Sequence, residues 1–236
     1  MRPFRSALVG VILLPLALAG SSRAAAAGEI HPDLPEAVDP ARRHLLYLHG
    51  AWIEQGGLEL LHPTHGRYEY QAIVRALEES GFVVISEVRK GETDAEAYAK
   101  KVASQVRRLL EQGVPPSQVT VMGHSKGGMI ALLAASELQE EKLNFVILAG
   151  CGRRGSAFGR SFERFLEERA ARLRGRFLSI YDASDEVAGS CREAFERAAV
   201  AESAEVVLET GLGHALFWSS RAVWIDEAVE WAEAKP

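Results

Sequence analysis

Short runs of hydrophobic residues alternate along the chain with longer segments in which hydrophobic positions recur every three or four residues. The short runs predict β-strands over residues 44–48, 82–86, 119–122, 145–149, 177–181 and 204–208. The longer segments predict amphipathic helices between these strands. Such alternation is typical of a mostly parallel sheet with helices on both faces, so the pattern predicts an α/β fold.

Several of the predicted helices show a face or a boundary in the sequence. One helix is predicted by hydrophobic positions that share a single face: Tyr70, Ile73, Val74 and Leu77. The next begins at a capping-box pattern formed by Thr93 and Glu96 and ends before Gly113. Further helices are predicted over 162–173 and 224–231.

The first 27 residues differ from the rest of the chain. Arg2 and Arg5 precede a hydrophobic run from Ala7 to Ala19, and small residues follow as far as Ala27. This order is typical of a secretory signal peptide with an Ala-x-Ala end, so we expect cleavage after Ala27. The alternative is an uncleaved anchor, for which the hydrophobic run is short.

We expect three segments: the signal peptide at 1–27, a polar N-terminal arm at 28–43 and one domain at 44–236. With 47% hydrophobic and 25% charged residues, the chain has enough apolar material for a sizeable core. Cleavage would remove three arginines and no acidic residue, which moves the formal net charge from −5 to −8. An acidic mature domain argues against a nucleic-acid partner. We expect export to the periplasm or the medium, without a stable membrane anchor after cleavage.

The segment Gly123-His124-Ser125-Lys126-Gly127 lies between a predicted strand and a predicted helix. Gly-x-Ser-x-Gly at such a turn is a nucleophile elbow, which presents the serine hydroxyl above the C-terminal edge of a sheet. The N-terminus of the following helix favours negative charge beside the serine. Because glycine-rich turns also occur for packing reasons, the meaning of the motif depends on the rest of the sequence.

Three further segments with candidate functional residues also follow directly after predicted strands. The strand Leu46-Tyr47-Leu48 ends in His49-Gly50-Ala51, the strand at 177–181 is followed by two aspartates within 182–187, and the last predicted strand is followed by Gly213-His214. With these motifs in this order, the chain resembles the α/β-hydrolase superfamily from about residue 43 to 235. Only 150–176 is available where many relatives insert a lid domain. The resemblance therefore implies a compact, lidless esterase-like or thioesterase-like member.

The resemblance assigns a catalytic triad. Ser125 is the expected nucleophile, and His214 is the expected base, because a serine hydroxyl is a poor nucleophile at neutral pH. Asp185 is the expected acid that orients the histidine, since the superfamily's acid comes three residues after the position directly following the strand. Asp182, which occupies that position, is the alternative.

The resemblance also assigns an oxyanion hole and part of a substrate pocket. The backbone N–H groups of Ala51 and Lys126 are the expected oxyanion donors, with Trp52 as the alternative to Ala51. The long loop over 52–67 is expected to build part of the pocket. Trp52 and Leu58 are candidates to line it, and ordinary packing under the loop is the alternative interpretation.

The remaining candidates concern cysteine, histidine and arginine. Cys151 and Cys191 follow strands that are neighbours in the superfamily fold, so a disulfide beside the loop that carries Asp185, the acid loop, is expected in an exported protein. Two buried thiols, as in a cytosolic protein, are the alternative. His62 and His65 lack a third ligand, and we expect no metal and no cofactor. Arginines follow Cys151 at 153, 154, 160 and 164, and they are interpreted as a solvated face, with an anchor for an anionic group as the alternative.

These inferences predict an exported serine hydrolase that cleaves a small-molecule carboxylic ester or thioester through an acyl-enzyme intermediate. Two alternatives stay open. A peptidase or amidase would use the same triad on a different bond, and a non-catalytic binding protein would retain only the scaffold.

Overall fold

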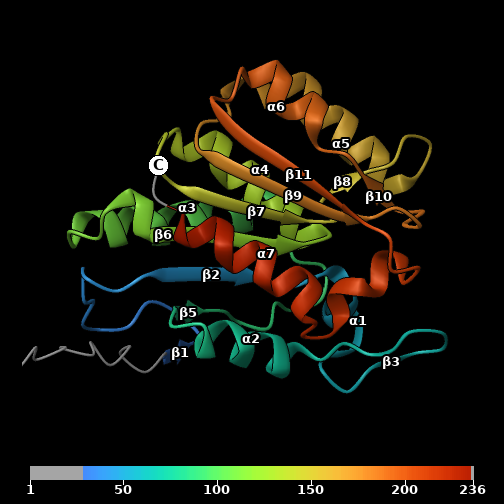
Figure 1. The fold of residues 1–236 in the computed structure, drawn as a ribbon, viewed down its shortest axis with the longest axis horizontal. Helices are drawn as coiled ribbons and strands as arrows, with labels where there is room; N and C mark the ends of the chain where they lie inside the picture. The colour runs from blue at the N-terminus through green and yellow to red at the C-terminus, as the bar shows by residue number, and fades with distance from the viewer. Residues whose placement is uncertain (1–28, 235–236) are drawn as a thin grey trace, which may run out of the picture.

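Seven parallel strands form the central sheet in the computed structural model, which describes residues 29–234 (Figure 1). The expected signal peptide, 1–27, lies outside the described residues. Across the sheet the strands are β1 (Glu29–His31), β5 (Val83–Ile85), β2 (His44–Leu48), β6 (Val119–His124), β7 (Asn144–Leu148), β9 (Arg176–Asp182) and β11 (Glu202–Leu208). All six predicted strands are present and every neighbouring pair is parallel, which confirms the predicted α/β class.

The middle strands of the sheet are buried at every position. β2 and β7 have the sequences His-Leu-Leu-Tyr-Leu and Asn-Phe-Val-Ile-Leu, and all five residues of each are buried. Parallel strands have this continuous hydrophobic character because helices cover both faces of the sheet. The edge strand β11 is only partly buried along its length.

The strand β1 is not predicted by the sequence. Glu29, Ile30 and His31 pair with Val83, Val84 and Ile85 of β5 and lie at the edge of the sheet. The three residues are mostly exposed and Pro32 follows them, so no hydrophobic run marks the strand. Part of the segment interpreted as an arm therefore pairs with the sheet.

Helices cover the two faces of the sheet unequally (Figure 1). One face carries α2 (Tyr70–Glu79) and α7 (Ala222–Glu233), and the other carries α3 (Ala95–Glu111), α4 (Lys126–Leu138), α5 (Ala157–Glu168) and α6 (Arg192–Ala198). Alternate residues of β2 divide between the two cores: Leu45 and Tyr47 join the first cluster, and Leu46 and Leu48 join the second. No helix among residues 29–234 is long and hydrophobic enough to cross a membrane.

Two predicted helix boundaries are wrong. Asp94, rather than Thr93, caps α3, because its side chain accepts a hydrogen bond from Ala97 N at 2.7 Å. The Thr93 hydroxyl instead donates to the carbonyl of Lys90. The helix predicted over 162–173 begins earlier, ends at Glu168 and gives way to the 3₁₀ helix η2 (Ala170–Arg172).

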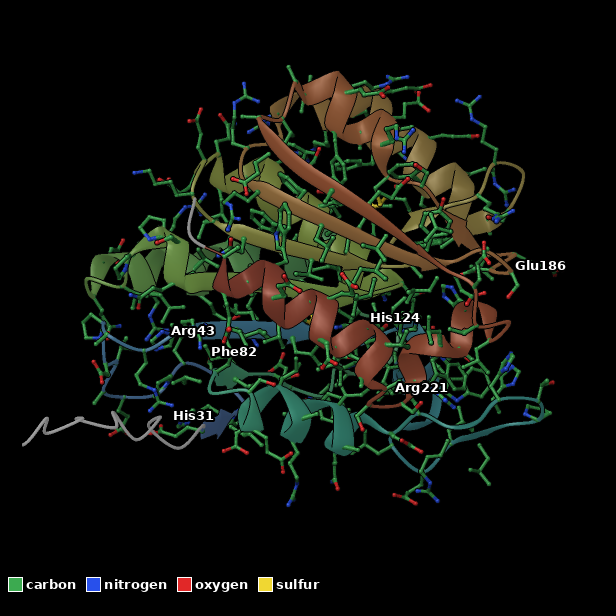
Figure 2. All side chains as sticks on the ribbon, viewed as in Figure 1. His31, Arg43, Phe82, His124, Glu186 and Arg221 are labelled. Atoms are coloured by element: carbon green, nitrogen blue, oxygen red, sulfur yellow. A yellow bond between two sulfur atoms is a disulfide. The ribbon has the colours of Figure 1, made fainter. Side chains whose placement is uncertain are left out.

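The remaining short elements surround the sheet. They are α1 (Ala51–Gly56), the hairpin β3 (Leu61–His62) and β4 (Gly66–Arg67), the antiparallel pair β8 (Cys151–Gly152) and β10 (Ala188–Gly189), and the 3₁₀ helices η1 (Pro116–Gln118) and η3 (Gly213–Trp218). The predicted disulfide between Cys151 and Cys191 is present, with its Cα atoms 5.3 Å apart, and connects β8 to the start of α6 (Figure 2).

The amino ends of the strands carry a charged contact of their own. Arg176, the first residue of β9, donates to Asn144 Oδ1 at 2.6 Å and to Glu202 Oε1 at 2.5 Å. Figure 2 labels Arg43 and Phe82 on this side of the molecule, and His124 and Glu186 on the opposite side, where the strands end. The two ends of the sheet thus carry separate sets of polar side chains.

Candidate active site

The strands β2, β6, β9 and β11 all deliver chemistry-bearing residues at their carboxyl ends. β2 leads into Ala51 at the start of α1, and β6 leads into Ser125. The loop after β9 carries Asp185, and the segment after β11 carries His214 in η3. Because parallel strands end at one edge of the sheet, residues far apart in sequence meet there.

Ser125 sits on a sharp turn between β6 and α4. Its φ of 54° and ψ of −118° lie outside the usual regions for a residue with a side chain, at a cost of about 1–3 kcal/mol. A Cβ on Gly123 would lie 2.2 Å from the Gly127 carbonyl oxygen, and one on Gly127 would lie 2.0 Å from that of Leu48. Both glycines are therefore required for the close approach of strand, helix and neighbouring loop.

The structure brings Ser125, His214 and Asp185 into one hydrogen-bonded series. His214 Nε2 lies 2.8 Å from Ser125 Oγ, and His214 Nδ1 lies 2.8 Å from Asp185 Oδ2. An imidazole held in this way can accept the serine proton while the carboxylate stabilises the imidazolium that forms. The catalytic roles of the three residues stay predictions.

The fully buried Asp185 is held by the main chain of its own loop. Its Oδ1 accepts hydrogen bonds from Val187 N at 2.7 Å and Ala188 N at 2.9 Å. The second oxygen is thereby left for His214. Ala188 also belongs to β10, so the pairing with β8 and the adjacent disulfide support the acid loop.

Asp182, the alternative acid, has different partners. Its Oδ1 accepts from the backbone N–H and hydroxyl of Ser184, and its Oδ2 accepts from the backbone N–H and hydroxyl of Thr210. Burial alone would raise the pKa of Asp182, but these four hydrogen bonds outweigh it and lower the pKa to about 2. Asp182 therefore connects the loop after β9 to the loop after β11 instead of contacting His214.

His124, the variable residue of the elbow motif, lies beside His214. The two ring centroids are 5.0 Å apart, and His124 Nδ1 lies 3.2 Å from the hydroxyl of Tyr68. Burial, and then the neighbouring His214, hold the pKa of His124 well below its usual range, so its ring is neutral. The sequence gives no signal for this contact beyond the position of His124 in the motif.

The two expected oxyanion donors are each the first residue of a helix, Ala51 in α1 and Lys126 in α4. The turn before α1 packs directly on the elbow. A Cβ on Gly50 would lie 2.9 Å from His124 Nδ1 and 3.6 Å from Ser125 Cβ. Gly50 thus permits the close approach of the two segments that carry the donors.

A buried ion cluster lies behind these segments. The carboxylate of Glu54 in α1 pairs with Arg89 Nε at 2.7 Å and with Lys126 Nζ at 2.5 Å. Arg89 also donates to the carbonyl of His49 and, through its backbone N–H, to His49 Nε2 at 2.8 Å. Burial, and then the charge of Arg89, lower the pKa of His49 to about 3 and keep this ring neutral. Sequence reasoning missed Glu54 and Arg89, because no motif marks them.

The two pocket candidates pack against the same hydrophobic core, the one that α2 and α7 cover. Trp52 stacks on Trp218 with centroids 5.7 Å apart and meets the ring of His62 at 4.7 Å. Leu58 is partly buried against the same core cluster. A surface hollow of about 500 Å³ lies elsewhere, beside the C-terminal half of α7, and its lining includes neither Trp52 nor Leu58. Their part in a substrate pocket stays a prediction.

Four of the other sequence candidates, His62, His65, Arg153 and Arg154, contact protein groups. His62 and His65 stack with centroids 4.5 Å apart, and no described group of three histidine, cysteine or acidic side chains is arranged to hold a metal ion. Arg153 donates to the carbonyls of Ala188 and Ala183, and Arg154 pairs with Glu193.

Comparison with solved structures relates this fold to several hydrolases. A metagenome-derived lipolytic enzyme, from a study of LipS and LipT, is 14% identical with a TM-score of 0.58, and the alignment covers 81% of this chain and 93% of that one. The monoacylglycerol lipase of Paleococcus ferrophilus is 15% identical with a TM-score of 0.55, and the alignment covers 80% of this chain and 93% of the lipase. A truncated carbohydrate esterase from gut microbiota is 14% identical with a TM-score of 0.53, and the alignment covers 85% of this chain and 90% of the esterase. At these identities the likeness shows the α/β-hydrolase fold.

The comparison with curated proteins finds no match. Residues 52–189 match the family described as Lipase (class 3), a range that includes Ser125 and Asp185 and ends before His214. The match spans more than half of the 236 residues. The chain is therefore a member of the class 3 lipase family, within the α/β-hydrolase superfamily.

Proposed function

We propose that the protein is an exported serine hydrolase that cleaves carboxylic ester or thioester bonds of small molecules. The observation that carries this proposal is the hydrogen-bonded series Ser125–His214–Asp185 on a nucleophile elbow. Family and fold support the coarser statement that the chain is of the ester-cleaving, lipase and esterase type. The triad, the thioester option and export belong to the proposal.

The first half of the reaction transfers the acyl group to the enzyme. Ser125 Oγ attacks the carbonyl carbon while His214 Nε2 takes the hydroxyl proton, and Asp185 stabilises the imidazolium. The backbone N–H groups of Ala51 and Lys126 receive the oxyanion of the tetrahedral intermediate. The intermediate collapses as His214 gives the proton to the departing alcohol or thiol.

The second half releases the acid. A water molecule attacks the acyl-enzyme, and His214 takes its proton. A second tetrahedral intermediate then collapses, the Ser125 oxygen leaves and is protonated by His214, and the free carboxylic acid departs. The neutral state of the adjacent His124 suits this cycle, because a second positive charge beside the imidazolium would oppose proton transfer to His214.

Export is proposed from two independent features. The first 27 residues have the order of a signal peptide, and the disulfide Cys151–Cys191 is of the kind that persists in oxidising compartments. The mature protein would begin at Gly28. N-terminal sequencing of protein recovered from the periplasm or the medium tests this, and a start at Met1 would contradict it.

The proposed function is tested by labelling the mature protein with a fluorophosphonate probe, which reacts with activated serines. We expect the wild type to be labelled and Ser125→Ala and His214→Ala to remain unlabelled. A panel of matched ester, thioester and anilide substrates then defines the bond, with turnover of the first two expected. A folded wild type that is not labelled would overturn the serine mechanism, and turnover confined to anilides would indicate an amidase.

A further inference from the structure

Glu54 is a buried carboxylate with two cationic partners. The Glu54 side chain is 3% exposed and that of Arg89 is fully buried, whereas that of Lys126 is 24% exposed. Removing such charges from water is costly unless close partners offset the loss. Here one carboxylate accepts from both cations, so the cluster keeps a net charge of about +1 when all three groups are ionised.

This cluster joins three segments that are distant in sequence. Glu54 belongs to α1, Lys126 begins α4, and Arg89 lies in the loop between β5 and α3. Lys126 Nζ also donates to the carbonyl of Thr93 in the same loop, at 2.5 Å. The side chain of Lys126 is therefore directed toward α1 and this loop by two hydrogen bonds.

The main chain just before α1 is held by the same cluster. Arg89 donates to the carbonyl of His49, and its backbone N–H donates to His49 Nε2. Since Nε2 accepts, Nδ1 carries the proton and donates to the carbonyl of Gly50 at 2.7 Å. The residues directly before Ala51 are thereby fixed through a side chain and two carbonyl groups.

The two expected oxyanion donors begin the two helices that Glu54 connects. Ala51 lies three residues before Glu54 in α1, and Lys126 is itself a partner of the Glu54 carboxylate. Two N–H groups stabilise an oxyanion only when both converge on one oxygen, and small displacements of such groups are costly. The net positive charge of the cluster has the sign that also favours an oxyanion.

We infer that Glu54 is a positioning residue that fixes the Ala51 and Lys126 N–H groups relative to each other and so sets the strength of the oxyanion hole. The inference rests on the proposed serine hydrolase function. It requires that loss of the Glu54 charge weakens the binding of the transition state more than it weakens the binding of the substrate. A residue that served only stability would not produce this difference.

The test compares Glu54→Gln with wild type on an ester that the wild type hydrolyses. Glutamine keeps the shape but cannot accept from both cations. We expect kcat to fall roughly ten- to hundredfold while KM stays within about twofold. The affinity for an alkyl boronic acid, whose serine adduct places an oxygen in the oxyanion hole, should fall by a similar factor.

Lys126→Met provides an independent variant. It keeps the backbone N–H, removes the ion pair with Glu54, and changes a side chain that is partly exposed. We expect a fall in kcat of about tenfold, and a double variant no slower than Glu54→Gln alone, since both changes break one connection. Glu202→Gln is the matched control. It breaks a charged pair with Arg176 at the opposite end of the sheet, so it should change stability alone.

The outcomes are separable. Wild type that is not labelled by the fluorophosphonate would overturn the proposed function and this inference together. Labelled wild type with unchanged kcat in a folded Glu54→Gln variant would overturn the inference alone, as would a loss of kcat equalled by Glu202→Gln. If Glu54→Gln does not fold, Lys126→Met decides: wild-type kcat and boronic acid affinity in that variant would overturn the inference.

Discussion

The imidazole of His124 packs against that of His214, with 5.0 Å between the ring centroids, and is itself buried. One elbow therefore supplies both Ser125 and a ring that contacts, at a tilt, the histidine that bonds to this serine. His124 is in turn held by the hydroxyl of Tyr68, which lies 2.8 Å from that of Tyr47 on β2. The position of His214 is set by packing on one side and by Asp185 on the other.

Replacement of His124 by alanine should slow the enzyme without changing its pH dependence. Loss of the supporting ring leaves His214 freer to rotate, so we expect kcat/KM to fall about tenfold. Because the pKa of His124 lies well below its usual range, the residue is uncharged across the working pH range. The kcat/KM–pH profile should therefore keep its shape. A profile whose acid limb disappears in the variant would show that His124 itself titrates in the reaction.

The two aspartates at the carboxyl end of β9, Asp182 in the strand and Asp185 in the loop after it, should separate function from stability. Asp185→Asn removes the charge beside His214 Nδ1, and we expect kcat to fall on the order of a thousandfold or more. Asp182→Asn cannot accept all four hydrogen bonds, so it should lower the free energy of unfolding by about 1–3 kcal/mol while most of the activity remains. Steady-state kinetics and denaturant unfolding of both variants test this, and the reverse pattern would reassign the acid to Asp182.

Asp182 should also contribute to acid sensitivity. Its pKa falls from an ordinary value of 3.8 to about 2 in the folded protein, so the ionised form is stabilised by folding. This contribution, about 2 kcal/mol, is present above pH 4 and is lost as the pH falls toward 2. As the pH is lowered from about 5 to about 2, the free energy of unfolding should decline less steeply in Asp182→Asn than in wild type. Parallel curves would contradict the assignment.

The sequence predicts the sheet, most of the helices and the elbow for one physical reason: each is encoded by neighbouring residues. The hydrophobic run at 44–48 and the Gly-x-Ser-x-Gly segment are both local signals. β1 is different, because Glu29–His31 gains its strand conformation from pairing with β5, more than fifty residues away in sequence.

The same distinction explains what was missed in the candidate site. Glu54 contacts Lys126 across 72 positions of sequence, and Arg89 contacts His49 across 40. Neither pair forms a motif. A glutamate in a short helix such as α1 is ordinarily expected to be exposed, so the sequence does not mark Glu54 as buried. The three residues Ser125, Asp185 and His214 do not form a local motif either. They are recognised as a set only because their order and spacing match the superfamily pattern.

The disulfide should protect both the fold and the acid loop. Cys151 and Cys191 are buried, so a reductant should not reach the bond in the native protein at room temperature. Removal of both sulfurs in Cys151→Ala/Cys191→Ala should lower the free energy of unfolding by about 2–4 kcal/mol, because the bond closes a loop between residues 40 positions apart.

The double cysteine variant should lose some activity as well. The β8–β10 pair lies beside the bond, and Ala188 of β10 donates to Asp185 Oδ1, so a looser pair leaves the acid less well held. We expect a fall in kcat of about threefold to tenfold at temperatures where the variant is fully folded. Denaturant unfolding with and without reductant, together with kinetics at low temperature, tests both effects. Full activity combined with lower stability would show that the bond supports the domain but not the placement of Asp185.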